Sequence, residues 1–184
     1  MRKKILAICG STRKTSANQR LIKAIVKLSS DTLGMKIFDG LSGIPHSNPD
    51  LDNNNPPENV LLFRRQLAEA DGILICTPEY AMGVPGILKN AIDWTVSSME
   101  FSHKPVVLIT ASTAGHKAHQ SLMETLKVIE ADIPDSSQLL ISHVQTKLEE
   151  DKIIDATILK QVENVIASLV NTISTTKDPL SSSF

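Results

Sequence analysis

The sequence predicts an α/β fold built on a doubly wound parallel sheet of five strands in the order 2-1-3-4-5, with a three-layer α/β/α arrangement. Three observations support this prediction. Short apolar runs alternate with segments of helical periodicity, which is typical of βαβ units. A hydroxyl-rich turn follows the first apolar run, where such folds bind phosphate. The chain has 184 residues, enough for one domain over residues 1–176, with a frayed Ser-rich tail over 177–184.

Each expected strand is a short apolar run. The runs cover residues 5–9, 35–38, 72–76, 106–109 and 138–141. The third and fourth are apolar throughout, so we expect both of their faces to be covered. The second is more polar, which favours a position near an edge of the sheet.

The expected helices carry apolar residues at helical spacing. The first covers residues 17–30, and the second has an apolar face of Val60, Phe63, Leu67 and Ala70. The third runs from Pro85 to about residue 98, the fourth covers residues 116–130, and the fifth has its apolar residues from Ile158 to Ile173. The loop at 39–57 is long for a compact domain, and such loops are usually functional or part of an interface. Within it, residues 52–55 are expected to form a solvated turn without chemistry.

Composition excludes several classes of function. The net charge is −1 and no aromatic residue interleaves with the basic N-terminal region, so we expect no nucleic-acid partner. No apolar run is long enough to cross a bilayer and no signal peptide is visible, which favours a cytoplasmic protein without a membrane partner. Cys9 and Cys76 each close an apolar run, a pattern that predicts buried, inert thiols in a reducing compartment.

The turn at residues 10–18 is the centre of the expected site. In the predicted sheet, the loops at 10–16, 77–83 and 111–115 meet at the carboxyl ends of the strands, where such folds bind ligands. The start of the following helix offers free N–H groups and a positive dipole end to an anion. Hydroxyl, amide and guanidinium donors are added by Ser11, Arg13, Ser16 and Asn18, and no Asp or Glu occurs between residues 1 and 30. The alternative is an ordinary polar turn before a solvated basic helix.

The turn does not match other well-known phosphate motifs. It has one glycine, so it lacks the G-x-G-x-x-G of dinucleotide-binding folds, and it lacks the G-x-x-x-x-G-K-[ST] of NTPases. A phospho-accepting receiver would need an aspartate where this chain has Cys76-Thr77. A phosphate held by hydroxyls, backbone and one arginine suits a mononucleotide such as FMN, with its ring on the second and third loops.

Two motifs resemble the signatures of the NADPH-dependent FMN reductase family, whose members are flavodoxin-like flavoproteins. GSTRKTSAN at 10–18 resembles the pattern G-S-x-R-x-x-S-x-N, and TPEY at 77–80 followed by VPGILKNAIDW at 84–94 resembles the second signature. NPDL at 48–51 resembles a weaker pattern, and the resemblance covers residue 5 to about residue 126. It implies bound FMN, and dimers that are often paired into tetramers.

The resemblance also assigns the site residues. It places Ser11, Arg13, Ser16 and Asn18 around the FMN phosphate, and it implies that the flavin ring is bordered, mainly through backbone groups, by Pro78, Glu79, Tyr80, Ala81 and Met82. The chain departs from the family in two loops. Family members commonly have Asn and a small residue where this chain has Ala81-Met82, and consecutive glycines where residues 112–115 contain only Gly115. We still expect Ser112 and Gly115 to lie near the ring.

Other conspicuous residues have structural interpretations. Tyr80 could shield the flavin, shape the pocket or simply pack as a loop aromatic. Asp93 and Trp94 are expected to brace the third helix against the sheet and loops. His116 and His119 have a spacing that could share a metal, but we expect surface histidines and no metal site.

The expected function is an NAD(P)H-dependent flavin oxidoreductase. Hydride would pass from the nicotinamide of NADPH or NADH to the flavin and on to a quinone, a free flavin or an azo compound. The flavin carries the chemistry, so no catalytic side-chain acid or base is assigned. The alternatives are a flavodoxin-like electron carrier and a non-catalytic FMN-binding protein. Carriers of this kind are usually strongly acidic, whereas this chain is nearly neutral.

Overall fold

The structure is a computed structural model that describes residues 2–53 and 55–176; the tail predicted over 177–184 lies outside the described residues. Its centre is a five-stranded parallel sheet in the order β2-β1-β3-β4-β5, as predicted. The strands are β1 (Lys3–Cys9), β2 (Leu33–Phe38), β3 (Gly72–Thr77), β4 (Val106–Ser112) and β5 (Gln138–Ser142). Two strand predictions are confirmed, because β3 is buried along its whole length and β2 is an edge strand.

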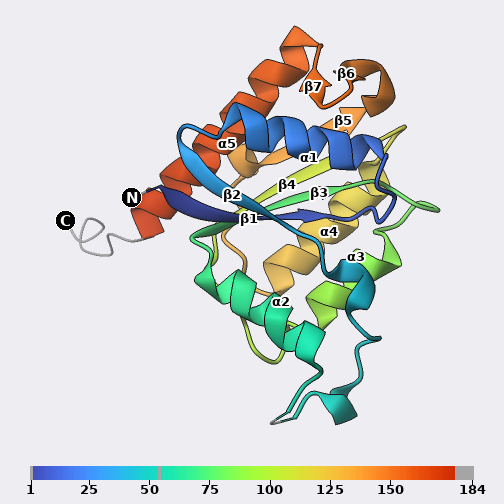
Figure 1. Ribbon diagram of the computed structural model, residues 1–184, viewed down its shortest axis with the longest axis vertical. Coiled ribbons are helices and arrows are strands. Elements are labelled where there is room, and N and C mark those ends of the chain that lie inside the picture. Colours follow the sequence, from blue (N-terminus) through green and yellow to red (C-terminus); the bar gives the residue numbers. More distant parts are fainter. Residues whose placement is uncertain (1, 54, 177–184) are drawn as a thin grey trace.

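Helices cover both faces of the sheet, which confirms the three-layer arrangement (Figure 1). On one face lie α1 (Ala17–Leu28) and α5 (Ala156–Thr176), and on the other lie α2 (Glu58–Glu69), α3 (Gly86–Asp93) and α4 (His116–Val128). Each face buries its own apolar cluster because alternate residues of the central strands point to opposite sides. The amphipathic faces of α1 and α5 meet in the first cluster.

The third helix is shorter than the sequence predicts, since α3 ends at Asp93 rather than near residue 98. After α3, the Trp94 ring enters the core, where 1% of the residue is exposed. Its Nε1 donates to the carbonyl of Pro45 at 2.8 Å. The expected bracing role of Trp94 is therefore confirmed, whereas the Asp93 carboxylate pairs with Lys89 on its own helix and does not brace the loops.

The long loop after β2 contains two short 3-10 segments, η1 (Leu41–Gly43) and η2 (Pro49–Leu51). Asn90 of α3 holds this loop at two points. Its Nδ2 donates to the Pro45 carbonyl at 2.9 Å, and its Oδ1 accepts from the backbone N–H of Ser47 at 2.7 Å. Backbone polar groups of the loop are thus satisfied by a helix next to the expected site.

The prediction of a solvated turn at residues 52–55 is wrong for Asp52, whose side chain is only 17% exposed. Its carboxylate accepts from the Arg64 guanidinium of α2 at 2.9 Å and also hydrogen-bonds the Ser97 hydroxyl. The Ser97 hydrogen bond is the main cause that lowers the pKa of Asp52. Arg64 also donates from Nε to the Trp94 carbonyl at 2.8 Å, so one ion pair joins the loop, α2 and the end of α3.

A two-stranded hairpin between β5 and α5 was not predicted. It consists of β6 (Leu148–Glu149) and β7 (Lys152–Ile153), and it lies beside α1 and α5 in Figure 1. Leu148 and Ile153 are buried in the same cluster as α1 and α5. Two further 3-10 segments, η3 (Asp135–Ser137) and η4 (Val144–Lys147), flank β5. Among the described helices, none combines the length and apolarity needed to cross a bilayer.

Candidate functional site

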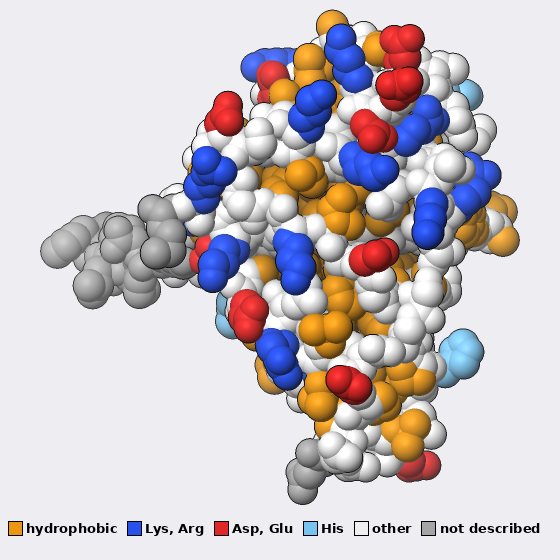
Figure 2. Space-filling view, viewed as in Figure 1, with side chains coloured by type: hydrophobic (Ala, Val, Ile, Leu, Met, Phe, Trp, Pro, Cys, Tyr) orange, Lys and Arg blue, Asp and Glu red, His pale blue; other side chains and the backbone are white. Residues whose placement is uncertain are grey.

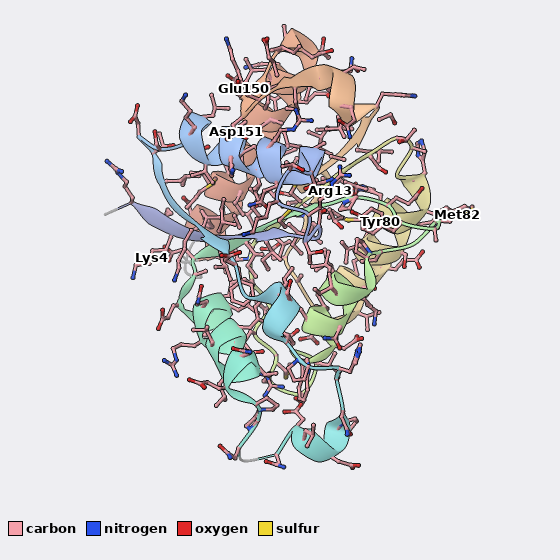
Figure 3. The ribbon with its side chains drawn as sticks, turned by 45° about the vertical axis from the view of Figure 1, so that its right-hand side comes forward. Lys4, Arg13, Tyr80, Met82, Glu150 and Asp151 are labelled. Atoms are coloured by element: carbon pink, nitrogen blue, oxygen red, sulfur yellow. The ribbon has the colours of Figure 1, made fainter. Side chains whose placement is uncertain are left out.

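The candidate site lies at the carboxyl ends of β1, β3 and β4. Cys9 pairs with Cys76 and Thr77 pairs with Thr110, so the loops that leave these strands start at the same level of the sheet. The strand order reverses between β1 and β3, and this switch point is where open α/β sheets bind ligands. Figure 3 shows Arg13, Tyr80 and Met82 at this end of the sheet and Lys4 at the other end.

Gly10 allows the first two loops to approach closely. Its N–H donates to the Cys76 carbonyl at 2.8 Å, which extends the ladder between β1 and β3. A Cβ atom at this position would lie 2.3 Å from Oγ1 of Thr77, which is closer than two atoms can pack. Glycine is therefore required for packing here, in addition to its place in the expected phosphate-binding turn.

The turn at residues 10–18, which we call the phosphate loop, has the features of an anion site. Ser11 and Ser16 are buried, whereas Arg13 and Lys14 are exposed. Ser16 caps α1, because its Oγ accepts from the backbone N–H of Gln19 at 3.1 Å, and its hydroxyl hydrogen remains able to donate. The first turn of α1 contains no acidic residue. An anion here would meet a helix N-terminus, hydroxyl donors and a guanidinium.

Asn18, a member of the predicted phosphate set, has both polar atoms of its side chain bonded to strands of the sheet. Its Nδ2 donates to the carbonyl of Ala111 at 2.8 Å, and its Oδ1 accepts from the Cys76 thiol at 3.3 Å. The residue is 3% exposed. The amide therefore fixes the start of α1 to the ends of β3 and β4, and in this way it positions the phosphate loop that leads into α1.

The second loop reaches the phosphate loop through a side chain. The hydroxyl of Tyr80 lies 3.1 Å from Oγ of Ser11, and either group can donate. Tyr80 is 53% exposed, whereas Ser11 is 5% exposed. The phenol oxygen thus contacts the phosphate loop while about half of the residue is exposed to solvent. Of the interpretations of Tyr80, this contact favours a role in shaping the pocket.

A tight turn follows Tyr80 and carries backbone strain. The N–H groups of Tyr80 and Gly83 donate to each other's carbonyls at 3.0 and 2.9 Å. Between them, Ala81 and Met82 have φ values of 47° and 62°. Such two-residue turns favour Asn-Gly, because both central residues take a left-handed conformation. This chain holds Met82 there, 69% exposed, at the tip of the loop.

Glu79 joins the second loop to the third. Its carboxylate accepts the backbone N–H groups of Ala118 at 2.9 Å and Gly115 at 3.4 Å, at the start of α4. These bonds, led by the one from Ala118, lower the pKa of Glu79. Gly115 itself cannot cap the helix with a side chain, so a carboxylate from a neighbouring loop takes that role. The sequence did not predict this role of the carboxylate.

The remaining predicted ring-bordering residues complete the rim. Pro78 is buried at the start of the second loop, and Ser112 is half-buried at the end of β4. Gly115 has a φ of 99°, and a Cβ there would lie 2.8 Å from the side chain of Leu140. The third loop thus keeps a glycine where both backbone conformation and space require it.

The two thiols beneath the phosphate loop are free and buried, as predicted. Desolvation raises the pKa of Cys9, although hydrogen bonds from Ser11 and Ser16 oppose it. Burial also raises the pKa of Cys76, well above its usual value. Neither thiol is therefore activated as a nucleophile, because the thiolate is the reactive form.

The expectation of surface histidines is wrong for His119. Its Nδ1 lies 2.9 Å from Oγ1 of Thr110 and its Nε2 lies 3.0 Å from Oε1 of Gln138, so the partly buried ring links β4 to β5. His116 is exposed. Within residues 2–53 and 55–176, no group of His, Cys, Asp and Glu is arranged to hold a metal ion.

Comparison with known proteins gives consistent results. The family profile described as NADPH-dependent FMN reductase matches residues 3–146. An NAD(P)H-dependent FMN reductase of Pseudomonas aeruginosa is 33% identical over 151 residues, which cover 79% of this chain and 81% of that protein. A quinone reductase of Escherichia coli K12 is 28% identical over 79% of this chain and 80% of its own length. The solved structure of FerB, a flavoenzyme NAD(P)H:(acceptor) oxidoreductase from Paracoccus denitrificans, superposes with a TM-score of 0.77 and 26% identity, covering 94% of this chain and 98% of that one.

Proposed function

Because the chain belongs to the NADPH-dependent FMN reductase family, it is an FMN-dependent oxidoreductase that uses NAD(P)H, and we propose which residues perform this function. It takes hydride from NADPH or NADH and passes it to a quinone, a free flavin or an azo compound. Relatives named as quinone reductases and a structural neighbour named as an azoreductase support these acceptor classes. The flavin, when bound, supplies the hydride chemistry.

The observation that carries the proposal is the meeting of three loops around an anion-binding helix terminus. FMN ends in a dianionic phosphate, and the phosphate loop offers it the hydroxyls of Ser11 and Ser16, the free N–H groups at the start of α1 and the exposed guanidinium of Arg13. No carboxylate lies in the loop or in the first turn of α1 to repel the phosphate. The residues present therefore fit the group.

We assign the other residues to holding and orienting the cofactor. Asn18 positions the phosphate loop through Ala111, and Glu79 fixes the third loop through α4. The ring is bordered by Pro78, Glu79, Tyr80, Ala81, Met82, Ser112 and Gly115. No side chain in this set is assigned as a catalytic acid or base, so the protein contributes binding, orientation and exclusion of water.

The protein is also proposed to act as a homodimer, or as a homotetramer made of such dimers. Large apolar side chains are exposed at two places, the tip of the second loop, where Met82 is 69% exposed, and the segment after α3, where Val96 and Met99 are 58 and 57% exposed. Large exposed apolar residues of this kind favour contact with another chain. The loop at 39–57 is bonded to α3 and to the segment after it through Asn90 and Trp94. Two free, buried thiols support a cytoplasmic location.

The test of the proposed function combines binding with steady-state kinetics. Folded apoprotein should bind FMN stoichiometrically, and FMN more tightly than FAD, whose internal phosphate is a diester. Turnover against NADPH at several quinone concentrations should give parallel double-reciprocal lines, because one open ring face admits one substrate at a time. Folded protein that fails to bind FMN would refute the proposal. Intersecting lines would show that the nicotinamide and the quinone bind together, and would refute a ring face that the two substrates share in turn.

A further inference from the structure

A cavity of about 520 Å³ lies on the β2 side of the phosphate loop. It shares Ser11 and Thr12 with that loop, and it continues along α1 to Lys23 and across to Asp39, which directly follows β2. None of its lining residues comes from the loops after β3 and β4, where the flavin ring is expected. The cavity is therefore next to the FMN site but separate from the ring.

The lining of the cavity combines the three kinds of surface that a nucleotide needs. Ile37, Phe38 and Leu41 supply apolar surface for a base. Lys14 and Lys23 are the cations of the lining, and Asp39 is its carboxylate. In dinucleotide-binding α/β folds, a carboxylate downstream of the phosphate turn accepts from a ribose hydroxyl.

The surroundings favour an anionic ligand. Asp151 of the β6–β7 hairpin lies 3.8 Å from Lys23, but both side chains are about half exposed, so this pair is weak. The segment from residue 1 to 30, which includes all of α1, has no other acidic residue to compete. Figure 2 shows Lys and Arg side chains over the part of this face where α1 lies, with acidic side chains among them.

We propose that this cavity, here called the adenylate cavity, binds the adenosine diphosphate half of NADPH or NADH. Lys23 contacts its phosphates, Asp39 accepts from a ribose hydroxyl, and the base lies on the apolar surface. The inference depends on the proposed function, because the nicotinamide half must reach the flavin across the shared residues Ser11 and Thr12. The pyrophosphate then lies between the side chains of Lys23 and Lys14, with Lys14 at the boundary between the two sites.

The test uses the FMN-loaded protein and a fragment without nicotinamide. Calorimetry should show that ADP-ribose binds the wild type. Lys23→Gln should weaken this binding up to about fivefold, as expected for one exposed charge contact. Lys27→Gln is the matched control, because it makes the same charge change one turn further along α1 and Lys27 does not line the cavity. Ser42→Trp should block binding by filling the cavity, which Ser42 lines.

A kinetic measurement separates binding from chemistry. In anaerobic stopped-flow reduction, Lys23→Gln should raise the Kd for NADPH by the same factor and leave the limiting rate of flavin reduction unchanged. Tighter binding of 2′-phospho-ADP-ribose than of ADP-ribose would support NADPH as the natural ligand, and equal or weaker binding would support NADH. Equal effects of Lys23→Gln and Lys27→Gln, or ADP-ribose binding that survives Ser42→Trp, would overturn the inference. In those cases FMN binding and reduction by NADPH would persist, so the proposed function would stand.

Discussion

Ser11 and Tyr80 are 69 positions apart in the sequence, yet their hydroxyl oxygens lie 3.1 Å apart. The contact joins the loop after β1 to the loop after β3 at the mouth of the site. It brings a phenol hydroxyl to the place where the FMN phosphate is expected, and we propose that Tyr80 borders the cofactor at its phosphate end as well as near its ring.

Tyr80→Phe tests this position of the hydroxyl. The variant keeps the ring and loses one hydrogen-bond donor, so we expect FMN to bind about threefold to tenfold more weakly. Riboflavin has no phosphate, and its affinity should not change. Fluorescence titrations of both flavins measure the difference. An equal loss of affinity for the two flavins would contradict the assignment. It would mean that the Tyr80 hydroxyl contributes to binding of the flavin ring and not of the phosphate.

Arg13→Ala should weaken FMN binding by about tenfold to a hundredfold, because a charge-assisted contact to phosphate is worth about 1.5–3 kcal/mol. Lys14→Ala is its neighbour control, with the same charge change in the same exposed loop. It should have a smaller effect, because lysine lacks the bidentate fork of arginine. Similar losses in both variants would show that only the general positive field matters. Both variants should keep the wild-type melting temperature as apoproteins.

The Ala81-Met82 turn should be stabilised by the residues that its backbone favours. Left-handed φ values cost non-glycine residues about 1–2 kcal/mol each, and Asn-Gly relieves most of this cost. The double change Ala81→Asn with Met82→Gly should therefore raise the free energy of unfolding by about 1–2 kcal/mol in denaturant titrations. Unchanged or lower stability would show that Met82 gains more from its contacts than its backbone loses.

Glu79→Gln should destabilise the protein in a pH-dependent manner. The pKa of Glu79 is lowered in the folded state, so its ionised form stabilises the fold above the unfolded pKa. This contribution is lost as the pH falls through the lowered pKa. The difference in unfolding free energy between wild type and Glu79→Gln should therefore be full at neutral pH and shrink in acid. If this difference in unfolding free energy does not depend on pH, the negative charge of Glu79 does not contribute to the capping of α4.

Much of the fold could be predicted because it depends on local patterns. Central parallel strands are buried on both faces, so the runs at 72–76 and 106–109 are apolar throughout. The hairpin β6–β7 has two residues in each strand, which is too short to show a strand periodicity. The early end of α3 coincides with the burial of Trp94 and its bond to Pro45, a tertiary contact that no local pattern reveals.

The site was predictable in its location but not in its internal contacts. The motifs place the expected residue types after β1 and β3, and the sheet order brings the loops that carry them together. The backbone partners of Asn18 and Glu79, however, are the carbonyl of Ala111 and the N–H of Ala118, which are distant in sequence. No side-chain pattern marks such a partner. The same holds for His119, whose role depends on the distance between β4 and β5.

The most direct test of the account is an anaerobic titration of the FMN-loaded protein with NADPH and with NADH, followed at the visible absorbance of the flavin. One equivalent of at least one nicotinamide should bleach the flavin, and added quinone should restore the absorbance. Flavin that stays oxidised in excess NADPH and NADH, yet is reduced by dithionite, would contradict this expectation and would support an electron carrier instead.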